Sequence, residues 1–260
     1  MPVSLNTVMV VLAGMNDKTR CIILKSMDYH DYDAILTVYS KEYGKISFLA
    51  KGIRRMKSKN AGSLLPYTET EIQFDYHPSK TMFTLKTASS LHIWRHMHED
   101  LEASTAASVI AEASDGLLYQ EVKDESIYDQ LFQAMDLLDK KENTVTVLSL
   151  FLIALMKNSG IVPDVDECVV CGNKQVSTIS VDDGGFLCTK HMNEKGLAQM
   201  PASDLRRFRL LVKGGLEHFD LIRETGGAEM EDLKILVEMI RLHAGISMKS
   251  FGLFERLFSH

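Results

Sequence analysis

Residues 31–55, DYDAILTVYSKEYGKISFLAKGIRR, decide the fold of this chain. Within residues 44–51, apolar and polar side chains alternate with period two, which is typical of a β-strand that buries one face. The apolar face carries Ile46, Phe48 and Ala50, and the opposite face carries Lys45, Ser47, Leu49 and Lys51. The segment therefore predicts two strands joined by a short turn, with lysines flanking the outer face of the second strand.

The same pattern continues into the flanking sequence. Short runs rich in β-branched and aromatic residues predict five strands, at residues 20–27, 34–40, 44–51, 69–76 and 81–89. Turn-forming residues such as His77, Pro78 and Ser79 separate these runs. Five short strands in one continuous stretch fit a small N-terminal β-barrel.

From about residue 91 the apolar residues recur with the period of an α-helix. This period predicts helices near residues 98–121, 126–140, 143–158, 203–219, 228–248 and 250–258. The apolar run 145–156 is far shorter than the ~20 residues of a membrane-spanning helix, so we expect it to form a buried core helix. The predicted fold class is therefore α+β, a five-stranded barrel followed by a mainly helical region.

Length and composition agree with a folded chain. The 260 residues are 45% hydrophobic and 25% charged, without a low-complexity tract, which excludes the disordered and fibrous classes. Residues 1–14 lack the basic leader of a signal peptide, and Met15 is followed at once by charged residues and a strand-like run. We interpret residues 1–14 as an N-terminal extension and expect a cytoplasmic protein.

Charge is distributed unevenly along the chain, although the net charge is only −6. Residues 15–95 carry 13 Lys and Arg against 8 Asp and Glu, whereas residues 96–260 carry 16 against 27. No acidic residue occurs between Tyr43 and Thr68. Such asymmetry indicates that the first part binds nucleic acid and that the acidic second part meets proteins instead.

The acid-free stretch contains six cations, Lys45, Lys51, Arg54, Arg55, Lys57 and Lys59. Uncompensated like charges repel one another, which favours a groove that follows nucleic-acid phosphates over the alternative of a solvated loop. Four further cations extend the predicted DNA-binding surface, namely Arg20, Lys25, Lys86 and Arg95. Tyr29, Tyr32 and Tyr39 are either base-stacking residues or members of the barrel core and rim.

A second motif, with the spacing of metal ligands, interrupts the helical region. Two residues separate Cys168 from Cys171, and after a further sixteen residues Cys188 and His191 are again separated by two. Two such knuckles present four ligands at the corners of a tetrahedron, as in structural zinc sites, and glycines after the second ligand and before the third supply tight turns. The alternative is that reduced thiols merely pack in the interior.

Four protein ligands leave no open coordination position, so we expect one structural Zn²⁺ ion rather than a catalytic one. The motifs GxSxG, GxGxxG and HExxH and the phosphate-binding P-loop do not occur in the sequence. We therefore expect no enzyme activity. Two alternatives stay open, a zinc-ribbon module that binds RNA or acts in transcription, and a hydrolytic metalloenzyme.

A basic island lies within the acidic second part and consists of Arg206, Arg207, Arg209 and Lys213. These residues predict either a pocket for an acidic peptide or a DNA phosphate, or ordinary surface ion pairs with carboxylates such as Glu217 one turn further along. We retain them as the candidate site for a partner peptide.

Four segments together carry a family resemblance. They are the opening stretch at residues 31–55, LPYTETEIQF at 65–74, SGIVPDVDECVVCGN at 159–173 and GGFLC at 184–188. In this order they resemble the bacterial recombination mediators of the RecO family. The resemblance extends from about Met15 to the C-terminus and leaves out residues 1–14. His191 is a departure from it, because the family's metal site is often all cysteine.

The resemblance implies an OB-fold DNA-binding domain at residues 15–90 and a helical domain at 91–260 that bears a zinc module at about 165–195. It also implies a non-enzymatic repair factor that binds single- and double-stranded DNA, anneals complementary strands and assists RecA loading onto coated strands. The implied partners are RecR, the acidic C-terminal tail of single-stranded DNA-binding protein and, indirectly, RecA. The implied location is the cytoplasm, in association with the nucleoid and not with membranes.

Overall fold

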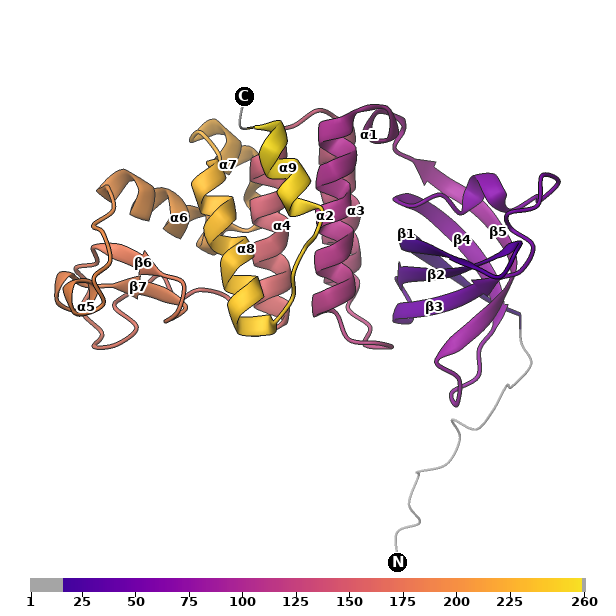
Figure 1. The fold of residues 1–260 in the computed structure, drawn as a ribbon, viewed down its shortest axis with the longest axis horizontal. Coiled ribbons are helices and arrows are strands. Elements are labelled where there is room, and N and C mark those ends of the chain that lie inside the picture. The colour runs from indigo at the N-terminus through magenta and orange to yellow at the C-terminus, as the bar shows by residue number, and fades with distance from the viewer. Residues whose placement is uncertain (1–15, 259–260) are drawn as a thin grey trace, which may run out of the picture.

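The computed structural model describes residues 16–258, so the interpretation of residues 1–14 as an extension lies outside the described residues. The molecule is elongated, with a β-barrel at one end, a bundle of helices in the middle and a small module of two short strands and a helix at the other end (Figure 1). The division of the chain into domains at about residue 90 stays a prediction.

Five strands close into the barrel: β1 (Asn16–Tyr29), β2 (Asp33–Ser40), β3 (Gly44–Ala50), β4 (Thr68–Asp75) and β5 (Met82–Ile93). Their order around the barrel is β1-β2-β3-β5-β4, and only the contact between β3 and β5 is parallel. This confirms the predicted five-stranded, OB-like barrel. The side chains that alternate inward, among them Phe48, Phe74 and Phe83, fill its interior.

Strand β1 is buried on both of its faces. Cys21 and Ile23 point into the barrel interior, whereas Ile22 and Leu24 belong to the core of the helical bundle. The register with β2 shifts between Ile23 and Lys25, which marks a β-bulge at this point. Beyond the bulge, residues 25–29 are exposed. One strand therefore joins the barrel to the helices.

The bundle consists of α1 (Arg95–Glu99), α2 (Leu101–Leu117), α3 (Glu125–Asp139), α4 (Thr144–Asn158), α6 (Ala202–Gly214), α7 (Phe219–Glu224), α8 (Met230–Ala244) and α9 (Phe251–Leu257). Helix α4 lies among the others and is buried at every position from Thr144 to Met156, as its apolar run predicts. None of the helices within residues 16–258 is long and apolar enough to cross a membrane.

Two predicted helices are shorter than their periodicity suggests. The segment 98–121 is divided at Asp100, which has an extended backbone and accepts a hydrogen bond from Ala103 N as the cap of α2. The segment 203–219 stops at Gly214, because Gly215 adopts φ +73°, and a short 3-10 turn, η2 (Leu216–His218), follows. Both breaks depend on capping geometry rather than on apolar period.

The small module at the far end contains β6 (Thr178–Ser180), β7 (Gly185–Leu187) and α5 (Thr189–Glu194). Its strands pair antiparallel, and Ile179 and Phe186 join the core of the helical bundle. Its other side has a cluster of only three buried residues, Cys168, Leu187 and Cys188. Apolar packing alone therefore does little to hold that side together.

Candidate metal centre and nucleic-acid interface

The four predicted metal ligands meet at one point of the small module. Cys168 and Cys171 lie in the loop before β6, Cys188 caps the N-terminus of α5, and His191 lies one turn into that helix. His191 Nδ1 is 3.3 Å from Cys168 Sγ and 3.4 Å from Cys188 Sγ, and Cys171 Sγ is 3.8 Å from Cys188 Sγ. All four ligand atoms lie within 4.8 Å of one another.

These separations fit a tetrahedral metal ion. With bonds of about 2.3 Å to sulfur and about 2.0 Å to nitrogen, a tetrahedron has edges of about 3.8 Å between sulfurs and about 3.5 Å between sulfur and nitrogen. The observed distances of 3.8 Å and 3.3–3.4 Å match these edges. The cluster can therefore hold one metal ion, which would have no remaining open position.

Local backbone geometry shapes both knuckles. The N–H groups of Cys171 and Gly172 donate to Cys168 O at 3.2 and 2.8 Å, which closes the first knuckle, and Gly172 has φ +70°. Ahead of the second knuckle, Gly184 has φ +71°, and a Cβ on Gly185 would lie 2.3 Å from Asp164 O. The predicted need for glycine at these turns is confirmed.

The surroundings of the cluster favour a thiolate at Cys168. Burial raises the pKa of this thiol, but hydrogen bonds from the backbone of Cys188, Val170 and Cys171 and from the His191 ring outweigh burial and lower the pKa to about 6. His191 Nε2, the nitrogen that faces away from the sulfurs, lies 3.8 Å from Glu194 Oε2. This separation exceeds hydrogen-bond distance, so Glu194 faces the imidazole without a direct bond to it.

The basic loop, residues 51–59, is at the other end of the molecule and leaves the barrel after β3. Its five cations, Lys51, Arg54, Arg55, Lys57 and Lys59, all have exposed side chains. The loop is held against the β1–β2 turn, because Arg54 N donates to Tyr32 O at 3.0 Å and Gly52 N donates to Asp33 Oδ1 at 2.7 Å. Two hydrogen bonds thus attach the loop that carries the five cations to the β1–β2 turn.

Two of the six predicted cations have carboxylate partners that are distant in sequence. The expectation that Lys45 is exposed on the outer face is wrong: its residue is 7% exposed, and its ammonium group donates to Asp115 O and lies 3.6 Å from Asp115 Oδ1. Arg54 Nη2 lies 3.0 Å from Asp28 Oδ2. Lys45 therefore stabilises the contact of the barrel with α2, and we remove it from the candidate interface.

The four outlying cations lie on elements other than the loop, and two of them have carboxylate partners. Arg20 is exposed on β1, and Arg95 is exposed at the start of α1. Lys25 lines a cleft of about 490 Å³ between the barrel, α2 and residues 245–250, with its Nζ 3.9 Å from Asp115 Oδ2. Lys86 Nζ forms an ion pair with Asp75 at 2.5 Å.

The three candidate stacking tyrosines divide into two groups. Tyr39 is 1% exposed and donates its hydroxyl to Asp124 O at 3.2 Å, so it belongs to the core rather than to a binding surface. Tyr29 and Tyr32, at the β1–β2 turn, are 40% and 52% exposed. The guanidinium of Arg55 lies 5.2 Å from the centroid of the Tyr32 ring.

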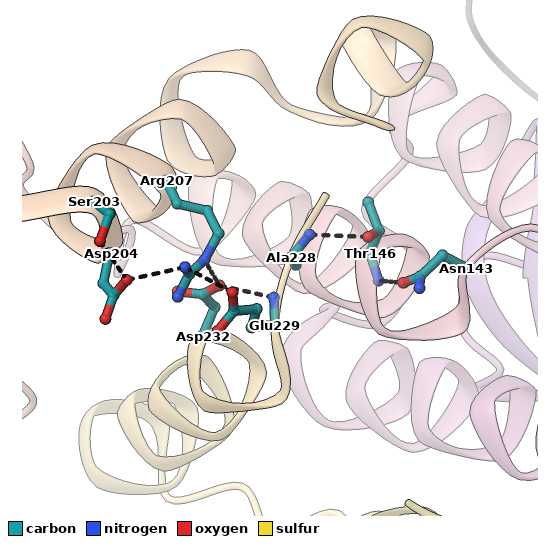
Figure 2. Close-up of polar contacts among 8 residues, drawn as sticks. All are labelled: Asn143, Thr146, Ser203, Asp204, Arg207, Ala228, Glu229 and Asp232. Carbon is teal, nitrogen blue, oxygen red and sulfur yellow. Dashed lines mark hydrogen bonds and ion pairs between the residues drawn. The ribbon is translucent and has the colours of Figure 1, made fainter. Parts of the chain in front are cut away.

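The basic island on α6 is not a pocket. Figure 2 shows the Arg207 guanidinium among three carboxylates: Arg207 Nε is 2.6 Å from Asp232 Oδ2, and Nη1 is 3.1 Å from Asp204 and 3.0 Å from Glu229. Asp232 is 1% exposed and also accepts from Glu229 N in the cap of α8. Arg207 is therefore a structural residue that ties α6 to the start of α8, and its assignment to a peptide site is wrong.

Of the other three residues of the island, two share one carboxylate partner and the third has none among the described residues. Arg209 and Lys213 both reach Asp166, at 3.0 and 2.6 Å, and so connect α6 to the loop that leads into the metal cluster. Arg206 is exposed, and no partner for it occurs within residues 16–258. Apart from Asp204 on α6 itself, the carboxylates that pair with this island come from other elements, and Glu217 is not among them.

Sequence reasoning missed the acidic residues that meet these cations. Asp28, Asp115 and Asp166 lie 26, 70 and 43 or more residues from the cations they contact. Nothing in the local sequence indicates such pairs, because tertiary folding alone brings them together. The only available signal was the acidic turn DYHDYD at residues 28–33, which indicated a turn but not its neighbour.

Comparison with known proteins identifies relatives of both parts of the chain. A family model described as Recombination protein O N terminal matches residues 15–94, and one described as Recombination protein O C terminal matches residues 98–251. A protein from Oceanobacillus iheyensis named DNA repair protein RecO is 27% identical over 256 residues, which cover 94% of each chain. A protein of the same name from Caldanaerobacter subterraneus is 28% identical and covers 90% of this chain and 95% of its own.

Proposed function

This chain belongs to the RecO family of DNA repair proteins, and from that premise we propose that it is a non-catalytic recombination mediator. In this role it binds single- and double-stranded DNA, anneals complementary strands and assists RecA in loading onto coated single strands. The basic loop is the observation that carries the proposal. Four of its cations, Lys51, Arg55, Lys57 and Lys59, have no carboxylate partner among the described residues.

Such a loop is suited to a polyanion. Each phosphate that a lysine or arginine neutralises releases condensed counterions, so the affinity depends on salt and little on sequence. The closed barrel holds the loop in place through the bonds of Gly52 and Arg54 to the β1–β2 turn. We propose Lys51, Arg54, Arg55, Lys57 and Lys59 as the centre of the DNA interface, with Arg20, Lys25, Lys86 and Arg95 as peripheral contacts.

Annealing requires no covalent step by the protein. Two complementary strands repel each other through their phosphates, and a cationic surface that neutralises part of this charge lowers the barrier to their approach. The acidic helical part disfavours wrapping of DNA around the whole molecule, so we assign contacts with RecR and with the tail of single-stranded DNA-binding protein to that part. This activity corresponds to a cytoplasmic protein associated with the nucleoid.

We propose Zn²⁺ as the ion at the cluster of Cys168, Cys171, Cys188 and His191. Three thiolates and one imidazole in a closed tetrahedron are typical of structural zinc, and they leave no position for a substrate. When bound, the ion would supply crosslinking only. The four side chains would then brace the module that Leu187 and the two buried cysteines cannot stabilise by packing alone.

Strand annealing tests the proposed function. Two complementary oligonucleotides, each coated with single-stranded DNA-binding protein, are mixed with the full-length chain, and duplex formation is followed by fluorescence energy transfer. We expect the chain to accelerate duplex formation and the variant Lys51→Glu/Arg55→Glu/Lys57→Glu/Lys59→Glu to lose this acceleration. A matched variant, Lys174→Glu/Lys190→Glu, reverses exposed charges on the metal module instead and should keep it. Equal activity of all three proteins would contradict the proposal.

A further inference from the structure

The β1–β2 turn presents negative charge directly beside the basic loop. Asp28 Oδ2 lies 3.0 Å from Arg54 Nη2, and Asp33 Oδ1 accepts from Gly52 N at 2.7 Å. Asp31, at the tip of the turn, is exposed and has no partner within residues 16–258. The turn, residues 28–33, and the basic loop, residues 51–59, are thus in contact, and together we call them the ledge. The loop contributes its cations and the turn its carboxylates.

Flat and apolar groups lie at the boundary between the two sides. The Tyr32 ring is half-exposed, and the Arg55 guanidinium lies 5.2 Å from its centroid. Met56 is fully exposed at the tip of the loop. Aromatic rings backed by arginine are surfaces on which unpaired bases stack, whatever their sequence.

Single strands and duplexes would experience this ledge differently. A single strand can turn its phosphates toward the loop cations while its bases lie over Tyr32 and face the carboxylates. A duplex hides its base faces and carries phosphates on both sides, at about one charge per 1.7 Å of axis. One of its backbones would therefore approach Asp28 and Asp31, which lie within a Debye length of the loop and repel it.

We propose that the β1–β2 turn is a selectivity element, in which Asp28, Asp31 and the Tyr32 ring make the basic loop prefer unpaired bases to duplex DNA. The inference rests on the proposed function and deepens it, because a surface that disfavours duplex releases the product of annealing. Tyr32 is the residue that stacks, and the two carboxylates determine on which side the phosphates lie.

The experiment compares two probes of the same sequence, a labelled 20-nucleotide single strand and its blunt duplex, by fluorescence anisotropy at several salt concentrations. The variants are Tyr32→Leu, the conservative Tyr32→Phe, and Asp28→Asn. The matched control is Asp129→Asn, which removes the same charge and breaks an exposed ion pair, Lys41–Asp129 at 3.2 Å, away from the loop. Thermal unfolding verifies that each variant is folded.

We expect Tyr32→Leu to weaken single-strand binding about fivefold or more and duplex binding less than about twofold, because it removes a stacking surface. Tyr32→Phe keeps the ring and should retain the affinity, together with quenching of a 2-aminopurine base in the single strand. Asp28→Asn should strengthen duplex binding about threefold and single-strand binding by a smaller factor, since it removes a repulsive charge. Asp129→Asn should change neither affinity.

The inference would be overturned if the substitutions at Tyr32 and Asp28 changed the affinities for the two probes equally. Unchanged affinities in Tyr32→Leu or Asp28→Asn would also overturn it. So would a gain of duplex affinity in Asp129→Asn as large as that in Asp28→Asn. These outcomes differ from a failure of the proposed function, in which the unaltered chain binds neither probe. If both probes bind and the loop cations are required, but selectivity does not respond to the turn, only the selectivity element is excluded.

Discussion

The two ends of the molecule are stabilised in different ways (Figure 1). The barrel interior is a cluster of fourteen buried residues that includes three phenylalanine rings in mutual contact. The small module has, away from the bundle, a hydrophobic cluster of three buried residues, Cys168, Leu187 and Cys188, and two of these are candidate metal ligands. Buried apolar area therefore holds one end in place, whereas at the other end four side chains form a cluster that can hold a metal ion.

The two ends also differ in the sequence separation between the residues that interact at each candidate site. The four candidate ligands lie within 24 residues, and glycine turns within that segment shape both knuckles. In the basic loop, by contrast, Arg54 pairs with Asp28 from β1, and Lys45 on β3 pairs with Asp115 from α2. A motif of ligands close together in the sequence therefore predicts a site more reliably than a run of charges does. Folding can bring carboxylates from distant segments to the charges, and the local sequence does not show these partners.

Removal of the metal should have the largest effect and should separate the two ends. We expect a chelator, or Cys168→Ser, to unfold residues 160–196 while the barrel stays folded, because ion binding supplies most of the module's stability, on the order of 10 kcal/mol in small zinc-dependent folds. Hydrogen exchange resolved by segment measures this. Cys21→Ala, which alters a thiol in the barrel, should keep one metal ion per chain. Full protection of residues 160–196 from hydrogen exchange without metal would show that this module, like the barrel, is stable without an ion.

Arg207→Met should have the next largest effect, because it leaves the nearly buried Asp232 without its guanidinium partner. We expect a loss of about 3 kcal/mol in the free energy of unfolding, measured by urea denaturation. Arg206→Met is the matched control on the same helix, since Arg206 is exposed and without a described partner, and it should change stability by less than about 0.5 kcal/mol. Similar losses in both variants would show that position on α6 matters rather than the buried pair.

Lys45→Met and Lys57→Met compare a buried and an exposed cation of the same acid-free stretch. The first should cost about 2 kcal/mol of stability, because it leaves the Asp115 carbonyl oxygen and carboxylate without their ammonium donor, and should leave the salt dependence of DNA binding unchanged. The second should leave stability unchanged and reduce the slope of log affinity against log salt by about one. Denaturation and salt-dependent anisotropy measure the two quantities, and a reduced slope in Lys45→Met would return this residue to the interface.

Gly172→Ala should have the smallest effect and probes the knuckle itself. Its φ of +70° is unfavourable for alanine, whose Cβ would also lie 3.3 Å from Glu167 Oε1. We expect a loss of about 1 kcal/mol, together with weaker metal retention in a competition with a chromogenic chelator. Gly62→Ala near the basic loop has open space for its Cβ, so its stability and metal retention should match those of the unaltered chain.

Much of the fold follows from the sequence alone, because periodicity reports which faces are buried. The period-two pattern of residues 44–50 predicts β3, and the apolar run after Asn143 predicts the buried helix α4. The predicted helix 203–219 ran past its real end because the apolar stripe continues to Phe219, although Gly214 and Gly215 are unfavourable in a helix interior and glycine commonly ends a helix. Sequence patterns also did not predict the length of β1, whose second face is covered by helices that begin some 70 residues later.

The candidate site divides in the same way. The spacing of Cys168, Cys171, Cys188 and His191 predicted a cluster, and the structure brings the four ligand atoms together. The basic island on α6 was predicted from charges close in the sequence, without their positions in the fold, and Arg207 proved to be half-buried and paired with carboxylates from α6 and α8. The roles of the remaining candidate residues, as DNA contacts, metal ligands or peptide contacts, stay predictions that the experiments above test.

The strand that serves two cores has a mechanical consequence. Strand β1 contributes Ile23 to the barrel core and Ile22 and Leu24 to the core of the helices. Bending at the junction would therefore disrupt the packing of both cores. Further ties, such as the Tyr128 hydroxyl to Glu69 at 2.8 Å, reinforce the same joint. The barrel and the helical bundle should therefore move as one body, so that a DNA strand bound at the basic loop would stay at a fixed distance from a partner bound to the bundle.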